Sequence, residues 1–301
     1  MLADISSTRV LFHTGATTCH SRVILARWVS ESERVVALVT EETPFHPIDH
    51  RWPDQPGDSG SVETCETLLP VLDTITAASP QKSETLHLGQ DIPVPRAALG
   101  WTWLVVHIAR VPADGVLRPV DLVGKDVILK VDEDRRRNLN ASHTASHLFS
   151  FAFNQTTRRF WKGLAAKFDS LRNPDLDQLS IQSSRITEKE SVDHYRFGKT
   201  VSRSGFHSAG LLEVLDDIQT QVNETMNEWI RLGGRARIEA PSLQLEARRQ
   251  WICELHVGTA RMACGGTHLE RLNQLASTRV MFEKSPGLPE IKVHTQPELK
   301  K

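Results

Sequence analysis

The stretches His143-Thr-Ala-Ser-His147 and Cys264-Gly-Gly-Thr-His268 decide the predicted fold of the second half of this chain. Each contains two metal-binding side chains four residues apart, and together they supply three imidazoles and one thiolate. This donor set suits tetrahedral zinc. Because a long stretch of chain separates the two, a local zinc finger is excluded. The donors have to converge through the fold of the whole second half.

The first stretch fits a helix. Residues four apart on an α-helix lie on the same face, so His143 and His147 can reach one ion. We predict a helix that runs from Asn140, as its N-cap, to about Phe153. An isolated pair of histidines at this spacing is as often a coincidence as a metal site, so the helical motif alone predicts no function.

The second stretch is more restrictive. Gly265 and Gly266 each disfavour a helix by about 1 kcal/mol and favour a tight turn. Such a turn folds Cys264 and His268 back toward a common point, and glycine lets a substrate come close to the backbone. Thr144 and Thr267 stand next to predicted ligands. Their hydroxyls either contact the substrate or a catalytic water, or they pack in the ordinary way.

Composition sets outer limits. With 301 residues, of which 39% are hydrophobic, the chain can bury a full core, and its length favours two domains over one. The net charge of -1 does not point to nucleic acid, but residues 1 to 138 are net negative and residues 139 to 301 are net positive. A phosphate-bearing partner near the metal-binding stretches fits this asymmetry, and so does an ordinary solvated surface.

Several classes of protein are excluded at this stage. No run approaches the roughly 18 apolar residues of a membrane helix, and the segment after Met1 lacks the pattern of a signal peptide. We therefore expect a cytoplasmic protein with no membrane partner. The four cysteines follow no repeated spacing, which favours reduced thiols over a disulfide framework.

Hydrophobic patterning divides the chain near residue 138. Strand-like runs at 8–13, 21–29, 34–40, 101–110 and 126–131 predict a small β-barrel or sandwich for residues 1–138. Between these runs, residues 43–60 are rich in Pro, Gly and Asp and predict an ordered loop.

Residues 139–301 are predicted to be α+β. Helical patterns cover 140–153 and 209–232, and strand-like runs return at 250–257 and 277–283. Residues 294–301 are polar, and we expect them to be frayed.

The paired stretches resemble the signature of the alanyl-tRNA synthetase editing domain and of its free-standing relatives, the AlaX trans-editing proteins. Further matches follow in the family's order over most of the chain. They are Thr43-Pro-Phe-His-Pro47, Gln55-Pro-Gly-Asp-Ser-Gly60, the run from Val131-Asp132 through Arg135-Arg136, and Asn227-Glu-Trp-Ile230.

The resemblance implies an N-terminal β-barrel domain at 1–138 and a zinc-binding α+β editing domain at 139–301, like that of alanyl- and threonyl-tRNA synthetases. It implies a zinc-dependent hydrolase that removes the amino acid from mischarged tRNA, foremost Ser-tRNA(Ala) or Gly-tRNA(Ala). The implied site residues are the metal ligands His143, His147, Cys264 and His268, the catalytic residues Thr144 and Thr267, and the substrate-binding residues Gln55, Asp58, Gly265 and Gly266.

Alternatives remain open. Zinc either lowers the pKa of a water molecule or anchors the substrate's amino group. The implied partner is the acceptor end of a mischarged tRNA rather than DNA, and the chain is expected to be a monomer or a homodimer. Nothing resembles the synthetase catalytic core, so we do not expect the chain to charge tRNA. A transferase that passes the aminoacyl group to a small acceptor, or a non-catalytic metal-binding relative, is the competing interpretation.

The sequence also departs from the family pattern. Glycines typical of the medium AlaX class are replaced by Asp49-His-Arg-Trp-Pro-Asp54, which puts the amino-acid specificity in doubt. Residues 62–100 and 155–200 are extra, and the latter stretch contains Arg158-Arg-Phe-Trp-Lys162, which either reshapes the tRNA contact or is simply surface. A second basic stretch, residues 231–249, either contacts phosphates or is a solvated face, with the solvated face favoured.

Overall fold

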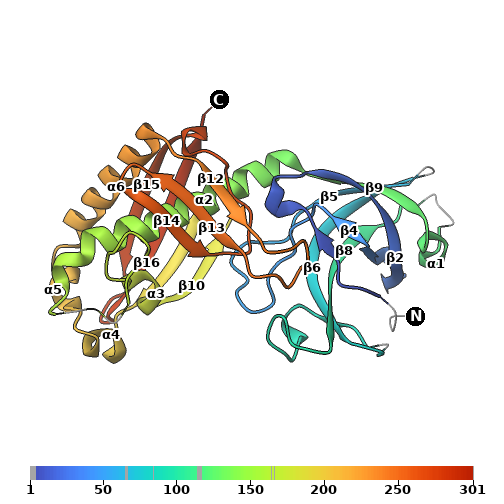
Figure 1. Cartoon of the computed structure of the whole chain (residues 1–301), viewed down its shortest axis with the longest axis horizontal. Helices are drawn as coiled ribbons and strands as arrows, with labels where there is room; N and C mark the ends of the chain where they lie inside the picture. Colours follow the sequence, from blue (N-terminus) through green and yellow to red (C-terminus); the bar gives the residue numbers. More distant parts are fainter. Residues whose placement is uncertain are drawn as a thin grey trace. The chain divides into compact units, whose positions relative to one another are not determined.

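The computed structural model describes residues 5–64, 67–83, 85–113, 117–163, 165 and 167–300. The chain forms two compact units (Figure 1). Unit 1 comprises Met1–Arg136 and Ala240–Arg249, and unit 2 comprises Arg137–Glu239 and Gln250–Lys301. The predicted domain boundary lies between residues 138 and 139. A division into compact units does not show which segments fold as domains, so this boundary stays a prediction.

Unit 1 is built on a closed barrel of six antiparallel strands. Its strands are β2 (Thr18–Ser30), β3 (Val35–Thr40), β5 (Gly60–Glu63), β6 (Leu68–Pro80), β8 (Trp101–Arg110) and β9 (Asp126–Val131). Their order is β5-β9-β2-β3-β8-β6, and the pairing of β5 with β6 closes the ring. Closure removes the unpaired backbone groups that an open sheet would leave at its edges.

The strand β3 shows why this barrel forms. All six of its residues are buried, which is typical of a strand covered on both faces. Val36 and Leu38 belong to one apolar cluster of the unit, and Ala37 and Val39 belong to another. Short elements complete the unit: β1 (Arg9–Val10), η2 (Phe12–Thr14), β4 (Glu42–Thr43), β7 (His87–Leu88), η3 (Gly89–Asp91) and α1 (Pro119–Leu122).

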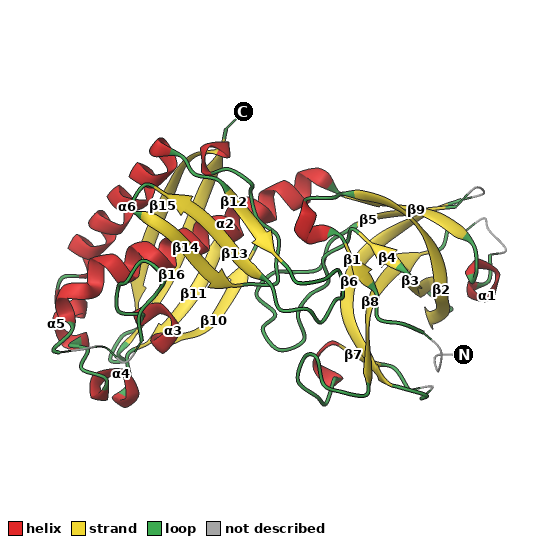
Figure 2. Cartoon of the chain, viewed as in Figure 1, coloured by secondary structure: helices red, strands yellow, loops and turns green. Residues whose placement is uncertain are grey.

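Unit 2 combines two antiparallel sheets with helices. The larger sheet has the order β10 (Ile181–Ile186), β11 (Ser191–Arg196), β16 (Glu290–Leu299), β15 (Leu275–Lys284), and the smaller has the order β12 (Ala236–Glu239), β13 (Gln250–Leu255), β14 (Gly258–Ala263). Figure 2 shows the two long helices, α2 (Glu133–Thr157) and α6 (Leu215–Leu232), running alongside these strands. The shorter helices are η4 (Arg158–Phe160), α3 (Leu176–Ser180), α4 (Lys199–Arg203), α5 (Ser208–Glu213) and η5 (Leu272–Gln274).

Helix α6 covers the edge strand β15 through amide side chains at every fourth position. Asn227 donates to the carbonyl of Thr278 and accepts from its N–H, each at 2.9 Å. Asn223 makes the same pair of bonds with Val280. These amides occupy backbone groups that would otherwise be unpaired at the sheet edge. The Asn227 of the family-like run therefore has a structural task.

The helix that carries His143 and His147 begins earlier than the sequence predicts. Asn140 is not its N-cap, because α2 starts at Glu133. Asp132 accepts a bond from the backbone N–H of Arg135 at 3.0 Å, as an N-cap does. Glu133 and Asp134 place negative charge in the first turn, where the helix dipole favours it.

The predicted fold class, a β-barrel followed by an α+β domain, is confirmed. Residues 62–100, which the sequence sets apart from the family pattern, contain β6, a strand of the barrel. One further local prediction is wrong. Residues 294–299 are not frayed, because they belong to β16, which lies between β11 and β15. Alternation of polar and buried side chains, rather than overall hydrophobicity, marks this strand.

Candidate metal centre

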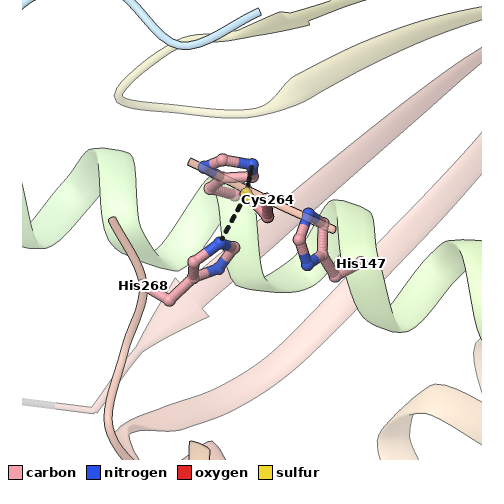
Figure 3. Close-up of side chains that lie close together, drawn as sticks. His147, Cys264 and His268 are labelled. Carbon is pink, nitrogen blue, oxygen red and sulfur yellow. Dashed lines mark hydrogen bonds between the residues drawn. The ribbon is translucent and has the colours of Figure 1, made fainter. Parts of the chain in front are cut away.

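The four predicted ligands lie together in unit 2. His143 and His147 are on α2, and Cys264 and His268 are in the loop that follows β14. One possible ligand atom from each of the four lies within 4.8 Å of the others. Figure 3 shows Cys264, His147 and His268 converging beside α2. The long-range convergence that the two sequence stretches require is therefore present.

The sulfur of Cys264 lies at the centre of these contacts. It lies 3.5 Å from Nε2 of His143 and 3.3 Å from Nε2 of His268. The backbone N–H of Gly266 donates to the same sulfur at 3.4 Å. Neither Gly265 nor Gly266 is among the glycines with positive φ. Their contribution is the absence of a side chain rather than a left-handed backbone.

Burial keeps the two helical imidazoles neutral. Desolvation lowers the pKa of His143 to about 3, and a hydrogen bond to the backbone carbonyl of Thr267 opposes part of that shift. Desolvation also lowers the pKa of His147, and the neighbouring His143 adds to the effect. Both rings are therefore neutral at pH 7, which is the form that binds a metal ion.

The two threonines next to the ligands hold them in place. The Oγ1 atom of Thr144 lies 3.3 Å from Nδ1 of His268 and accepts the backbone N–H of Leu269 at 3.0 Å. Thr267 is buried, and its backbone carbonyl accepts the hydrogen bond from His143. Outer contacts of this kind fix the orientation of a ligating ring.

Trp251 on β13 is a neighbour of the site that the sequence did not single out. Its ring lies 4.9 Å from that of His147 and 5.6 Å from that of His268, and it is fully buried. No spacing signal distinguished it from the other buried tryptophans, because its contact with the histidines depends on how β13 lies against α2.

The donor set fits a metal ion. Nδ1 of His147 is buried without a hydrogen-bond partner in the part of the chain that the structure describes. Buried polar atoms in folded proteins are rarely left in that state. Neutral imidazoles and a sulfur, held within a few ångströms, are donors that suit a divalent ion of intermediate softness. The cluster could therefore hold one metal ion.

Buried carboxylates also hold α2 through two of its serines. Ser146 donates to Asp193 at 3.2 Å, and Ser150 donates to Asp177 at 2.9 Å. Tyr195 donates to the same oxygen of Asp177 at 2.5 Å. Desolvation is the main cause that raises the pKa of Asp177 to about 7 and that of Asp193 to about 6. These bonds fix the helix that carries His143 and His147.

The predicted substrate-binding residues Gln55 and Asp58 lie in unit 1, in the loop between β4 and β5. Both are buried. Asp58 forms an ion pair with Arg136, whose Nε donates to it at 2.9 Å, and it also accepts the backbone N–H of His46. This geometry supplies Asp58 with a structural role. Contact of Gln55 and Asp58 with a substrate stays a prediction.

The glycine-poor segment of the same loop is held by one carboxylate. Asp49 accepts the backbone N–H groups of Arg51 and Trp52 at 2.7 and 2.9 Å, and it forms an ion pair with Arg96. Hydrogen bonds from an Asp side chain to the backbone two and three residues later are typical of a tight turn.

Among the described residues, no second group of His, Cys, Asp or Glu side chains is placed to hold a metal ion. Cys253 is buried while His256 is exposed, and burial raises the pKa of the Cys253 thiol to about 12. None of the cysteines that the structure describes forms a disulfide, and Cys65 lies outside the described residues.

The basic stretch at 231–249 is not one continuous solvated face. Arg237 forms ion pairs with Glu239 and Glu254. Arg249 is buried and donates to backbone carbonyls of its own loop. This part of the chain therefore offers fewer unpaired charges than its sequence suggests.

Among the described residues, none of the helices combines the length and the apolar character that crossing a bilayer requires.

No protein-family model matches the chain. Curated relatives do match. The chain is 29% identical over 260 residues to the alanine–tRNA ligase of Salinispora tropica, a match that covers 84% of this chain and 23% of the relative. It is 31% identical over 197 residues to that of a Parafrankia species, covering 60% and 18%. It is 25% identical over 317 residues to that of an Anaeromyxobacter species, covering 98% and 28%.

The chain thus spans only about a fifth to a quarter of the length of the curated relatives it matches. The Anaeromyxobacter match covers 98% of this chain and therefore includes the residues that form the cluster on α2 and after β14. The barrel and α+β units agree with the fold implied by the paired stretches. The predicted resemblance to alanyl-tRNA synthetases is therefore confirmed, because several alanine–tRNA ligases match the chain at 25–31% identity over up to 98% of its length.

Proposed function

We propose that the protein is a zinc-dependent trans-editing hydrolase that removes the amino acid from mischarged tRNA, foremost Ser-tRNA(Ala) or Gly-tRNA(Ala). One observation carries the proposal. His143, His147, Cys264 and His268, which come from two remote parts of the chain, bring their ligand atoms within 4.8 Å of one another. Similarity to alanine–tRNA ligases supports the tRNA substrate, and the donor chemistry supports zinc over the harder divalent ions.

The reaction is hydrolysis of the ester between the aminoacyl carbonyl and the terminal ribose. Water adds to the carbonyl, the ribose oxygen leaves with a proton, and the products are the free amino acid and the uncharged tRNA. An ester of this kind needs positioning and charge stabilisation more than it needs a strong nucleophile. When bound, zinc supplies a Lewis acid that polarises a carbonyl or lowers the pKa of water.

The chain's own residues have assigned tasks in this proposal. Thr144 holds the ring of His268, and the carbonyl of Thr267 holds the ring of His143. We assign the hydroxyls of Thr144 and Thr267 to contacts with the substrate or the attacking water. Gly265 and Gly266 let the acceptor end approach the backbone. We assign Gln55 and Asp58 to substrate binding.

A deacylation panel tests the proposal. Seryl-, glycyl- and alanyl-tRNA(Ala) are incubated with protein that was depleted of metal and then reloaded with zinc, without any small acceptor. We expect the seryl or glycyl ester to be consumed well above the blank rate with zinc and not after its removal. His143→Ala should lose both zinc and activity, while His256→Ala, which changes an exposed histidine, should keep both.

The same panel separates the alternatives. Consumption that requires an added acceptor, with the amino acid recovered on that acceptor, would indicate a transferase. If zinc-loaded protein consumes none of the three esters above the blank, the hydrolase assignment is wrong.

A further inference from the structure

Two chain segments meet at one end of unit 2 and form a fixed surface there. These segments are residues 155–163, at the C-terminal end of α2, and residues 198–207, which include α4. Trp161 and Phe206 form an isolated β-bridge, and their rings lie 5.4 Å apart. The N–H of Lys162 donates to Gly205 at 2.7 Å, and the N–H of His207 donates to Phe160 at 2.8 Å. Figure 1 shows α4 and α5 at the end of the unit that α2 reaches.

This surface carries positive charge without compensation. The two segments contain Arg158, Arg159, Lys162, Lys199 and Arg203, and neither contains Asp or Glu. All five side chains are exposed. None of them forms an ion pair with a carboxylate of the described residues. Elsewhere in the unit, by contrast, Arg196 pairs with Glu290.

The charged surface opens onto a groove. A hollow of about 490 Å³ lies where the end of α2 meets α6, and both Arg158 and Arg159 line it. The amides of Gln155 and Gln221 add uncharged donors and acceptors to the lining, and Glu224 is its one acidic group. Guanidinium groups beside amides suit an oxyanion with neighbouring hydroxyls, which is the chemistry of a ribose phosphate backbone.

We propose that this surface, which we call the basic end (Arg158, Arg159, Lys162, Lys199 and Arg203), binds the phosphodiester backbone of the tRNA away from its aminoacylated 3′ end. The inference rests on the proposed function, since it adds a second contact for the same substrate. Unpaired cations are the groups that gain most from a phosphate backbone, because binding releases the counterions of the RNA. Contacts of this kind position the RNA and carry no sequence information.

Binding of uncharged tRNA tests the basic end directly. The triple variant Arg158→Ala, Arg159→Ala, Lys162→Ala is compared with a control in which Arg27, Arg110 and Lys125, three exposed cations of unit 1, are changed to Ala. Fluorescence anisotropy gives the dissociation constant at several salt concentrations. We expect the first variant to bind about 10- to 100-fold more weakly, with a salt slope shallower by about 2 to 3, and the control to match wild type.

The proposal is overturned if both variants bind alike, or if the salt slope of the first variant equals that of wild type. Circular dichroism melting curves of all three proteins check that the substitutions leave the fold intact. Because the substituted side chains are exposed, we expect the three curves to coincide.

A second assay separates failure of this inference from failure of the proposed function. Hydrolysis is measured on full-length aminoacyl-tRNA and on a short 3′-aminoacylated oligonucleotide. The first variant should lose about 10-fold or more in kcat/KM on the full tRNA and keep its rate on the oligonucleotide. If wild type hydrolyses neither substrate, the proposed function is wrong. The binding experiment still tests whether the basic end binds tRNA.

Discussion

Two polar clusters, one in each unit, differ in composition. In unit 1, the carboxylate of Asp58 is matched by the guanidinium of Arg136 and by the N–H of His46. In unit 2, three imidazoles and a sulfur face one another, and one possible ligand atom from each lies within 4.8 Å of the others. A buried cluster whose partners all come from the chain stabilises the fold. A cluster of donors that face each other indicates a ligand.

The largest effect expected from this comparison is loss of the metal. Cys264→Ala removes the sulfur that contacts both His143 and His268. Zinc content should fall to background, and the hydrolysis rate should fall by about 100-fold or more. Cys253→Ala is the matched control, because Cys253 is a buried thiol outside the cluster. Zinc content is measured by elemental analysis. Equal zinc content in the two variants would show that the cluster around Cys264 does not bind the metal.

The next effect is a loss of stability when the ion pair between Asp58 and Arg136 in unit 1 is broken. Asp58→Ala leaves the charge of Arg136 buried and unpaired, so the free energy of unfolding should fall by about 3–5 kcal/mol. Adding Arg136→Met should recover much of that loss. Urea unfolding monitors both variants, and zinc content per folded chain should be unchanged. A stable Asp58→Ala protein with impaired hydrolysis would instead place Asp58 at the substrate.

A smaller effect is expected from the contact that orients His268. Thr144→Val keeps the shape of the side chain and removes the oxygen that lies 3.3 Å from Nδ1 of His268. Zinc affinity should fall by about 10- to 100-fold, as for other outer contacts of a ligand. Thr144→Ser retains the oxygen and should bind zinc as wild type does. Competition with a chromophoric chelator measures both, and equal affinities for the two variants would argue against the orienting role.

The smallest effect is a pH dependence of stability from Asp177. Burial raises the pKa of Asp177 from 3.8 to about 7, so the folded state favours the protonated acid. That contribution is complete below about pH 4 and is lost as the pH rises through about 7. Relative to Asp177→Asn, wild type should therefore lose unfolding free energy as the pH rises from 4 to 7.5. Parallel curves for the two proteins in urea unfolding would contradict this.

Local patterns predicted much of the fold. The runs at 34–40, 101–110 and 126–131 correspond closely to β3, β8 and β9, because continuous or alternating apolar residues bury a strand wherever it lies. The strand β6 escaped prediction, since its first half alternates between exposed and buried residues within a stretch that had been set aside as extra. The strand β16 escaped because polar side chains fill its outer positions.

The candidate site was predictable to the level of its ligands. Side chains four apart on a helix share a face, so His143 and His147 could be paired from spacing alone. The contacts of Thr144 and Trp251 with the histidines could not, because both cross between α2 and segments more than a hundred residues away in sequence. The hydrogen bond from Asn227 of α6 to Thr278 of β15 is likewise a tertiary contact that spacing does not reveal.

The sequence by itself determined which donors the chain has, how they are spaced, and which family pattern they follow. Hydrogen bonds within a turn and the period of a helix depend only on near neighbours, so a linear string contains them. Only the tertiary structure decided that the two stretches meet and that Asp58 is matched by Arg136. It also decided that five exposed cations, without a carboxylate partner among the described residues, lie at one end of unit 2. Such meetings depend on how whole sheets and helices pack, which no short stretch of residues specifies.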